Sequence, residues 1–453
     1  MSSIPTRANR GLERYDPNTN RVLVGGVGSV PTDVGVRVSH KLFSPRAGLA
    51  YRLGGVWVLR AGYGINTDPY PLARPMRTNH PVVVDSNVVG ANSFQFAGRL
   101  EEGIPSVLVP ELGNGIIAIP GNVGAITLDD KFNRGYVQSF NFTVQRELRG
   151  GFVGQVGYVG TRGIRQMVFQ HLNYAEPGRG NAGRVLSLRY PGRTGDVRVV
   201  KPFGTANYNS LQAQLERRFS GGYQLYGTYT YSKAIAYADE ADSVLQFNAP
   251  QVLHRNRSVT GYDRTHNLGV AFSAELPFGR GKRWAANGLS RNLLGGWLVS
   301  GGFSSLSGTP FTITAAGASL NAPNNLQTAD QVKPEVKILG GAGPGQSFFD
   351  PLAFRPVTEV RFGSSGLNVL RGPGAISLDL GLFREFAVSE RVKMQFRCEM
   401  FNAANTPHFN NPGTNVSNLQ LRPDGSVNLR GFSEITSAQN DERQFRFGLR
   451  VSF

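Results

Sequence analysis

Few residues in this 453-residue chain have the types and spacings that catalysis or metal binding requires. The six histidines show no ligand spacing, and the single cysteine, Cys398, is interpreted as a small apolar strand residue. Arg280-Gly-Lys282 lacks the first glycine of a phosphate-binding loop, because that position is Leu276. Sequence order alone assembles no Ser-His-Asp triad. We therefore expect no enzyme, no cofactor and no metal site.

One acidic cluster stands apart from this pattern. Asp239, Glu240 and Asp242 lie beside Tyr237 in a segment without strand periodicity. Carboxylate oxygens are ligands that hard cations such as calcium prefer, so the cluster is compatible with a cation site. A solvated loop explains the same residues without a ligand, and we favour that interpretation.

The chain carries a formal charge of +17, and its isoelectric point is near 10.2. A clustered basic surface of this strength would suit nucleic acid. The basic residues are instead scattered, often at alternate positions as in Arg446 and Arg450, without a long run. We therefore expect no nucleic-acid partner.

Hydropathy limits the classes of membrane protein to which the chain can belong. No apolar stretch reaches roughly 18 residues, which excludes a helical membrane protein. The mean hydropathy of −0.23 remains compatible with a transmembrane β-barrel, because its strands alternate lipid-facing and polar residues. The first ten residues are followed by no apolar core, so we expect no signal peptide.

The end of the chain shows the clearest periodicity. From residue 443 onward every second residue is large and apolar, and the chain ends on the aromatic Phe453. Strict alternation predicts a β-strand with one apolar and one polar face. A terminal aromatic on such a strand resembles the signal by which outer-membrane barrels are recognised. We expect Phe453 to serve as this assembly signal, with the barrel-assembly machinery as partner.

The same periodicity recurs upstream and predicts hairpins joined by short glycine-bearing or polar turns. The predicted strands cover residues 43–53, 56–65, 137–148, 152–161, 211–216, 223–231, 267–276, 294–313, 376–382, 392–400 and 443–453. Long polar segments at 66–136, 162–209, 237–264, 314–374 and 403–442 alternate with the short turns. Short connections on one side and long loops on the other are typical of outer-membrane barrels. Aromatic residues near strand ends predict girdles at the lipid interfaces.

The predicted fold is all-β, an incomplete antiparallel transmembrane β-barrel of eleven strands with long extracellular loops. Unpaired backbone groups have no partner in hydrocarbon, so a membrane sheet must close, and single-chain bacterial barrels have an even number of strands. Eleven is odd, so we expect the chain to be the C-terminal half of a longer barrel. Residues 1–41 are predicted to be an extracellular loop remnant and 42–453 the partial barrel, without plug domain or signal peptide.

The polar positions of the last strands are the candidate site residues. On the predicted strands they alternate with the apolar positions and would face the barrel interior. This predicted polar wall comprises Asp379, Gln395, Arg397, Glu399, Arg446 and Arg450. We expect these side chains to form ion pairs with one another, and the long loops to capture solute.

Several motifs carry a family resemblance. They include Tyr262-Asp-Arg-Thr-His266, Ser307-Gly-Thr-Pro-Phe-Thr312, Leu370-Arg-Gly-Pro-Gly374 and Phe43-Ser-Pro-Arg46. In this order and spacing, from about residue 43 to the end, the chain resembles the barrel of Oar-like TonB-dependent receptors. The resemblance implies a bacterial outer-membrane receptor for active uptake of an unknown solute. Such a receptor would have a barrel of about 22 strands and a plug inside it, with which the polar wall would also form ion pairs. The resemblance also implies that TonB acts only through an N-terminal part that this sequence does not contain.

Two other functions remain open. A passive porin or an adhesion-type barrel would share the strands and the outer-membrane lipid contacts but would lack a plug-encoding region. A soluble basic β-protein that binds polyanions would need no detergent, and its binding would weaken steeply with salt. The outer-membrane receptor is the interpretation that the motifs favour.

Overall fold

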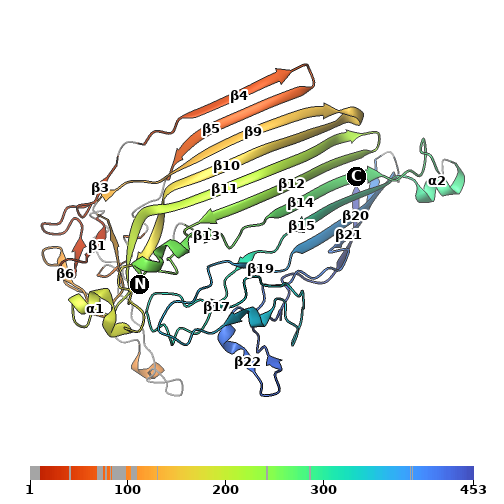
Figure 1. Ribbon diagram of the computed structural model, residues 1–453. Helices are drawn as coiled ribbons and strands as arrows, with labels where there is room; N and C mark the ends of the chain where they lie inside the picture. Colours follow the sequence, from red (N-terminus) through yellow and green to blue (C-terminus); the bar gives the residue numbers. More distant parts are fainter. Residues whose placement is uncertain are drawn as a thin grey trace.

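The computed structural model describes residues 11–39, 42–68, 75–76, 79–81, 83, 98–103, 110–129, 131–240, 243–284, 287–387, 389 and 391–453. One large antiparallel sheet dominates the molecule, and folded loops gather at one end of it (Figure 1). None of the helices among the described residues has the length and apolar character needed to cross a membrane.

Eleven strands form the continuous path of this sheet, as the sequence predicts. In chain order they are β4 (Arg46–Leu53), β5 (Trp57–Thr67), β9 (Tyr136–Leu148), β10 (Phe152–His171), β11 (Val197–Ser220), β12 (Tyr223–Ala236), β14 (His266–Glu275), β15 (Trp297–Leu306), β20 (Ala375–Ala387), β21 (Lys393–Phe401) and β24 (Gln444–Ser452). Each strand pairs with the next one in this order. Two short strands, β7 (Ala125–Leu128) and β13 (Ser258–Val259), join β11 and β12 and bring the sheet to 13 strands. Within the described residues, β4 and β24 each have one neighbour only.

Tight glycine turns join several of the hairpins. The Gly54-Gly55, Gly150-Gly151 and Gly221-Gly222 pairs all have positive φ, which side-chain-bearing residues rarely adopt. Leu53 pairs with Trp57, Leu148 with Phe152 and Ser220 with Tyr223, so the turns have two or three residues, which are the commonest hairpin lengths. The three glycine pairs therefore set the register of the hairpins β4–β5, β9–β10 and β11–β12.

The hairpin of β10 and β11 is longer than predicted. The predicted loop 162–209 begins and ends within strands, because β10 continues to His171 and β11 starts at Val197. The pairing shifts register around Gln166, and the next residues, Met167, Val168 and Phe169, are all buried. Consecutive burial removes the alternation on which the prediction depended.

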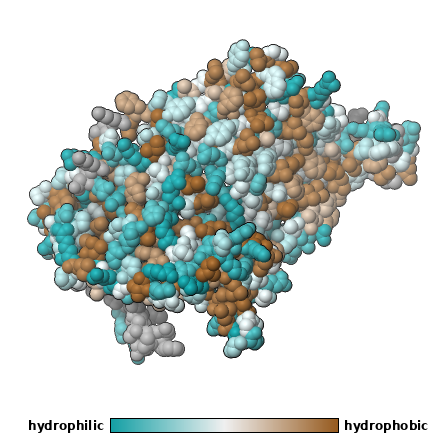
Figure 2. All heavy atoms as spheres, viewed as in Figure 1, coloured by the Kyte–Doolittle hydropathy of each residue, from teal (hydrophilic) through white to brown (hydrophobic). Residues whose placement is uncertain are grey.

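The register divides the eleven strands into two faces. The face that includes Phe447 and Leu449, here called the apolar face, exposes these side chains by 68% and 63%. Figure 2 shows hydrophobic residues gathered over the sheet and a more hydrophilic surface over the loop end. The opposite polar face carries mostly Gln, Ser, Thr, Gly and charged residues. Exposed apolar side chains on a membrane sheet are expected to contact lipid.

The loop end is folded rather than structureless. It holds the small strands β1 (Glu13–Asp16), β2 (Arg21–Val24), β3 (Arg37–Val38), β6 (Ile116–Ala118), β8 (Lys131–Phe132), β16 (Pro310–Phe311), β17 (Asp330–Gln331), β18 (Phe354–Arg355), β19 (Leu370–Arg371), β22 (Gln420–Leu421) and β23 (Val427–Asn428). It also holds α1 (Val185–Arg189) and 3-10 turns at Leu100–Glu102, Asn181–Gly183, Pro250–Asn256, Pro351–Ala353 and Val416–Asn418. At the other end of the sheet lie α2 (Gly288–Leu294) and a 3-10 turn at Arg149–Gly151 (Figure 1).

Buried apolar clusters hold these loops together. One cluster joins Val34 to Phe132 and Met167, and another joins Tyr15 to Leu186. The described part of residues 1–41 therefore packs against segments more than a hundred residues away in the sequence. A third cluster, centred on Phe349, lies within the long connections that follow β15 and β21. The extracellular position predicted for residues 1–41 remains a prediction.

Candidate functional site

The six residues of the predicted polar wall lie on one face of the sheet. Glu399 pairs with Arg446 across β21 and β24, and Gln395 pairs with Arg450. Arg397 lies between Gln395 and Glu399 on β21. On β20, the pairing register places Asp379 on the same face. The register therefore places all six on the polar face. Their position inside a barrel remains a prediction.

The contacts of the wall residues are mainly hydrogen bonds to near neighbours. The Nε of Arg397 donates to Oε1 of Gln395 at 2.8 Å, and the backbone N–H of Asn402 donates to Oδ1 of Asp379 at 2.8 Å. The guanidinium of Arg446 lies 5.8 Å from the ring centre of Phe401. Among the described residues no ion pair joins two members of the wall, although Glu399 and Arg446 face each other.

Sequence reasoning named the wall only on the last strands, yet the wall continues across the sheet. Gln145, Gln155 and Gln214 are cross-strand partners in one row of the polar face, followed by Thr228. Amide side chains can both donate and accept hydrogen bonds. Glutamines at alternate strand positions are the signal that would have extended the predicted wall to β9, β10 and β11.

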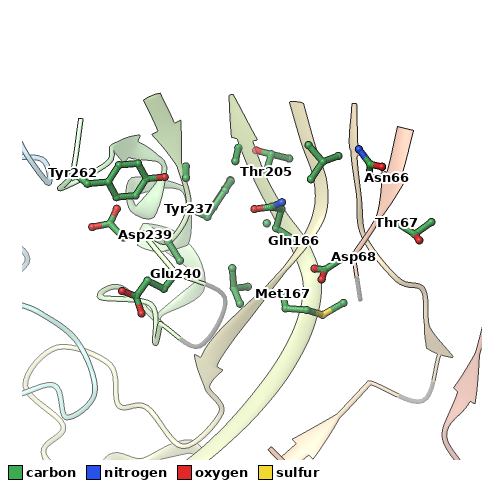
Figure 3. Close-up of a pocket in the computed structure, with 16 residues that line it drawn as sticks. Asn66, Thr67, Asp68, Gln166, Met167, Thr205, Tyr237, Asp239, Glu240 and Tyr262 are labelled. Carbon is green, nitrogen blue, oxygen red and sulfur yellow. The ribbon is translucent and has the colours of Figure 1, made fainter. Parts of the chain in front are cut away.

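A pocket of about 370 Å³ lies where this polar face meets the folded loops (Figure 3). Asn66, Val137, Ala206 and Ala236 belong to one cross-strand row of the polar face and line its floor. The small side chains of this row leave the space open. The polar face and the pocket thus form one continuous surface.

The walls of the pocket are acidic and aromatic. Tyr237, Asp239, Glu240 and Tyr262 stand on one side, and Asp68 stands on the other (Figure 3). The net charge of the whole chain is strongly positive, so these carboxylates make a local exception. Sequence analysis singled out Asp239 and Glu240, named Tyr262 only as part of a family motif, and missed Asp68, which comes from a distant segment.

One member of the acidic cluster, Asp239, has a structural role in the loop. Both carboxylate oxygens of Asp239 lie 3.1 Å from the backbone N–H of Gly261, which donates to them and closes the loop between these residues. Asp242, the third member, lies outside the described residues. Within the described part of the chain, no group of three or more His, Cys, Asp or Glu residues is arranged to hold a metal ion.

A second pocket, of about 450 Å³, lies on the other side of the segment 236–239. Its lining includes the amides and hydroxyls of Asn256, Asn368, Thr312 and Thr414. Asn256 is 2% exposed, and its side chain bonds four backbone groups at 2.7 to 3.0 Å. These bonds tie Asn256 to Gln246, Phe247 and Leu253 and fix this side of the second pocket.

Comparison with known proteins identifies the family. A model of the outer membrane beta barrel domain matches residues 1–446. The chain belongs to the outer membrane beta barrel domain family. The barrel domain accordingly resides in the bacterial outer membrane. No curated protein sequence matches it.

Solved structures similar to this outer-membrane barrel chain are much longer. The outer membrane transporter YddB from Escherichia coli has a TM-score of 0.44 and 8% identity, with 88% of this chain and 39% of that chain covered. The ferric-catecholate import receptor Fiu from E. coli K12 has a TM-score of 0.39 and 11% identity, with 90% and 34% covered. The siderophore receptor PiuA from Acinetobacter baumannii has a TM-score of 0.39 and 9% identity, with 90% of this chain and 35% of that chain covered. This barrel chain therefore spans less than half the length of each.

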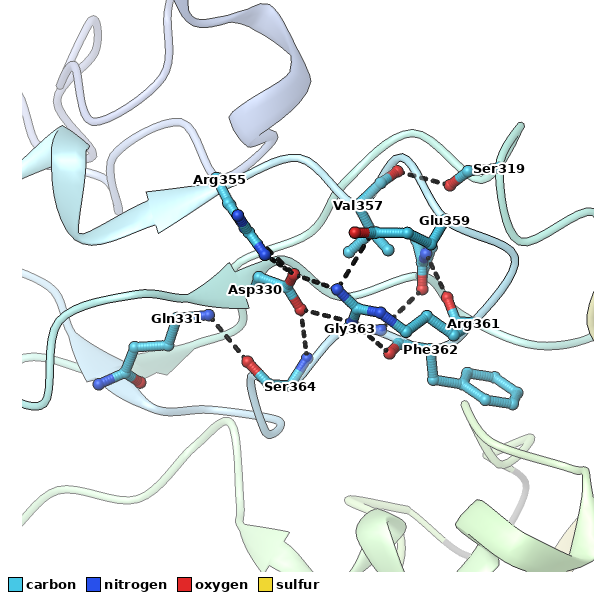
Figure 4. Close-up of polar contacts among 11 residues, drawn as sticks. Ser319, Asp330, Gln331, Arg355, Val357, Glu359, Arg361, Phe362, Gly363 and Ser364 are labelled. Carbon is cyan, nitrogen blue, oxygen red and sulfur yellow. Dashed lines mark hydrogen bonds and ion pairs between the residues drawn. The ribbon is translucent and has the colours of Figure 1, made fainter.

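An acidic clamp fixes the long loop between β15 and β20 of the outer-membrane barrel chain (Figure 4). The side chain of Asp330 is 6% exposed and accepts two hydrogen bonds from the guanidinium of Arg361, at 2.6 and 2.9 Å. Arg355 approaches at 3.4 Å, and the backbone N–H of Ser364 donates at 3.0 Å. The hydrogen bonds from Arg361 lower the pKa of Asp330 to about 2.

Three of the motifs that carry the family resemblance meet at the loop end of β14, β15 and β20. Arg371 forms an ion pair with Asp263, whose side chain is 1% exposed. The guanidinium of Arg264 donates to the carbonyl of Ser307 at 2.6 Å. A Cβ at Gly308 would lie 1.8 Å from the carbonyl oxygen of Gly372. The motifs therefore build one structural joint, and they lie outside the two pockets except for Tyr262 and Thr312.

Proposed function

We propose that this chain forms one side of an Oar-like, TonB-dependent receptor barrel that takes up a solute across the bacterial outer membrane. The observation that carries the proposal is the continuity between the polar face of the sheet and the acidic pocket at its loop end. A solute that binds in the pocket would already touch the surface along which it must pass. The resemblance of the ordered motifs supports the receptor class.

The open edges of β4 and β24 support a larger barrel. Within the described residues each of these strands has one hydrogen-bonded neighbour, and an unpaired strand edge is unfavourable in hydrocarbon. We infer that further strands pair with both edges and close the wall. TonB and a plug would act on the closed assembly, and Phe453, which is fully exposed, would be read during its assembly.

The pocket favours a particular class of solute. Its carboxylates attract cationic groups and accept hydrogen bonds, and its tyrosine rings stack against cations and apolar faces. We infer that the solute carries amine or hydroxyl groups. A strongly anionic solute would be repelled by Asp68, Asp239 and Glu240.

Uptake in the native host tests the proposal. Cells with and without the gene are given labelled solutes that carry amine or hydroxyl groups, and accumulation is measured with and without a protonophore. We expect gene-dependent accumulation that the protonophore abolishes. Accumulation that survives the protonophore would indicate a passive porin, and surface binding without accumulation would indicate an adhesin. Either result contradicts the receptor.

A matched pair of variants locates the site. Tyr262, in the pocket, is 60% exposed, and Tyr226, on the polar face near the short turns, is 46% exposed. Tyr262→Ala is expected to reduce uptake about tenfold through the loss of one aromatic contact, whereas Tyr226→Ala leaves the pocket intact. Equal uptake by both variants would remove the pocket from the proposal.

A further inference from the structure

A groove of about 520 Å³ crosses the apolar face of the sheet near the short turns. It extends from Trp57 and Arg146 to Tyr229 and Leu268, and Leu148 and Val156 also line it. The lining is almost entirely apolar. A hollow of this kind on a lipid-facing surface can accept an acyl chain more deeply than a flat strand surface can.

Two glycines lie in the groove, but only Gly227 leaves open space in it, since a Cβ at Gly154 would lie 3.2 Å from Cδ1 of Leu148. In one cross-strand row of the apolar face, Gly154 lies between Arg146 and Leu215, and Gly227 follows Leu215. Neither glycine has positive φ, so the backbone itself does not require them. A Cβ at Gly227 would meet nothing closer than the Leu215 carbonyl oxygen at 3.9 Å. The absent side chain therefore leaves real space.

Arg146 supplies a cation at one end of the groove. Its guanidinium lies 4.6 Å from the ring centre of Trp57, and the side chain is exposed. Within the described residues it makes no hydrogen bond or ion pair. Arg217, on the same face, instead donates to three backbone carbonyls of the neighbouring turns. The donors of Arg146 thus stay available for a phosphate.

Charge is segregated between the two faces of the sheet. Every carboxylate residue of the eleven strands lies on the polar face, namely Glu147, Glu216, Glu275, Asp379, Glu385 and Glu399. The apolar face of these strands carries Arg and Lys but no Asp or Glu. An anionic group that approaches Arg146 on this face meets no carboxylate of the strands.

The height of Arg146 also fits a headgroup. The next cation toward the loops on the neighbouring strand is Arg162, which is exposed on the same face. From Gly154, the cross-strand partner of Arg146, to Arg162 the strand extends about 26 Å, or about 19 Å along the membrane normal at a tilt of about 45°. The apolar band of outer-membrane barrels is about 25 Å tall, and a long arginine side chain at each end of this span extends toward the headgroups.

We propose that the groove binds one phospholipid of the bilayer, with an acyl chain over Gly154 and Gly227 and the phosphate on Arg146. This lipid site depends on residence in the outer membrane and not on the proposed uptake function. Trp57, which lines the groove, reports its occupation by fluorescence.

Quenching of Trp57 tests the site in the full chain. The other two tryptophans are replaced, W284F and W297F, and dibrominated phosphatidylglycerol is titrated into detergent micelles that hold the protein. We expect quenching that saturates at about one lipid per chain and reverses with unbrominated lipid. Quenching that rises linearly without saturation would overturn the proposal.

Two matched pairs of variants assign the parts of the groove. Gly227→Val fills it, whereas Gly302→Val adds the same side chain to open space on the polar face. Arg146→Gln removes the cation, whereas Arg218→Gln removes a 94% exposed arginine near the same turns. We expect G227V and R146Q each to weaken binding about tenfold and both controls to leave it unchanged. Equal effects within the arginine pair would overturn the proposal even if G227V failed to fold.

Discussion

The sheet and the folded loop end place large apolar side chains in opposite environments. Phe447 on the apolar face of β24 is 68% exposed, whereas Phe349 and Phe432 in the loops are completely buried. Lipid shelters apolar surface in the first region, and protein must shelter it in the second. The same residue type therefore stabilises the two regions by different means. The loop end resembles a water-soluble domain attached to a membrane surface.

Carboxylate groups also lie in different environments in the sheet and in the loop end. On the strands the acidic residues lie on the polar face, where Glu399 forms no ion pair among the described residues and those of Glu216, Glu275 and Glu385 are at exposed positions. In the loops, Asp330 and Asp263 are nearly inaccessible and are paired with arginines. A buried carboxylate depends on its partners, and an exposed one does not. Substitutions in the two regions should therefore have very different effects.

The largest expected effect is in the aromatic cluster of the loops. Phe349 lies 5.3 to 6.0 Å from the rings of Phe311, Phe354 and Phe432. Phe349→Ala is expected to destabilise the loop end by about 3–5 kcal/mol, because it leaves a cavity. Hydrogen exchange of the Phe348 amide, which bonds the carbonyl of Ser433, measures this change.

The matched control is Phe447→Ala on the apolar face. It removes the same ring from a surface that contacts lipid, far from the Phe348 amide in the fold. We expect exchange of that amide to be unchanged. If F447A accelerated it as much as F349A does, the loop end would not be a separate packed unit.

The next effect distinguishes the two faces of the sheet. Val270 on β14 lies on the apolar face, and Thr228 on β12 lies on the polar face. In lipid vesicles Val270→Arg should lower the free energy of unfolding by about 2–4 kcal/mol, because a cation enters the hydrocarbon. Thr228→Arg should cost less than about 1 kcal/mol. A larger cost for T228R than for V270R would reverse the assignment of the faces.

The clamp at Asp330 predicts an effect of acid on the loop end. Its pKa of about 2 lies below the ordinary value of 3.8, so its ionised form stabilises the folded loop. The stabilisation, about 2 kcal/mol, is fully present above pH 4 and is lost as the pH falls toward 2. Exchange of the Ser365 amide, corrected for intrinsic rates, follows it.

Asp330→Asn should remove this pH dependence and weaken the loop at neutral pH. Glu335→Gln changes an exposed carboxyl group in the same loop and should alter neither property. A D330N loop that still opened between pH 4 and 2 would show that another acidic group controls the transition.

Local periodicity explains how much of the fold was predictable. The eleven strands and their order follow from alternation and from glycine turns such as Gly54-Gly55, both of which are properties of neighbouring residues. The end of β10 was not predictable, since its buried residues no longer alternate. The loops were assigned as polar segments because residues such as Phe349 find their partners through tertiary packing.

The candidate site was also only partly predictable from the sequence. Alternation alone places Glu399 and Arg446 on one face. No local pattern brings Asp68 to Tyr262, or Asp330 to an arginine 31 residues away. Contacts between distant loops are set by the closing of the whole fold, so the pocket and the clamp emerged only from the structure.

The smallest expected effect is in the polar wall. Glu399→Gln removes a charge on the polar face without breaking an ion pair, so we expect a change in unfolding free energy of less than about 0.5 kcal/mol. Asp263→Asn makes the same chemical change at a buried ion pair and should cost about 1.5–3 kcal/mol. Urea unfolding of both variants measures the contrast. A large loss in E399Q would mean that the polar wall stabilises the sheet, whereas a neutral variant would show that the sheet does not depend on the charge of Glu399.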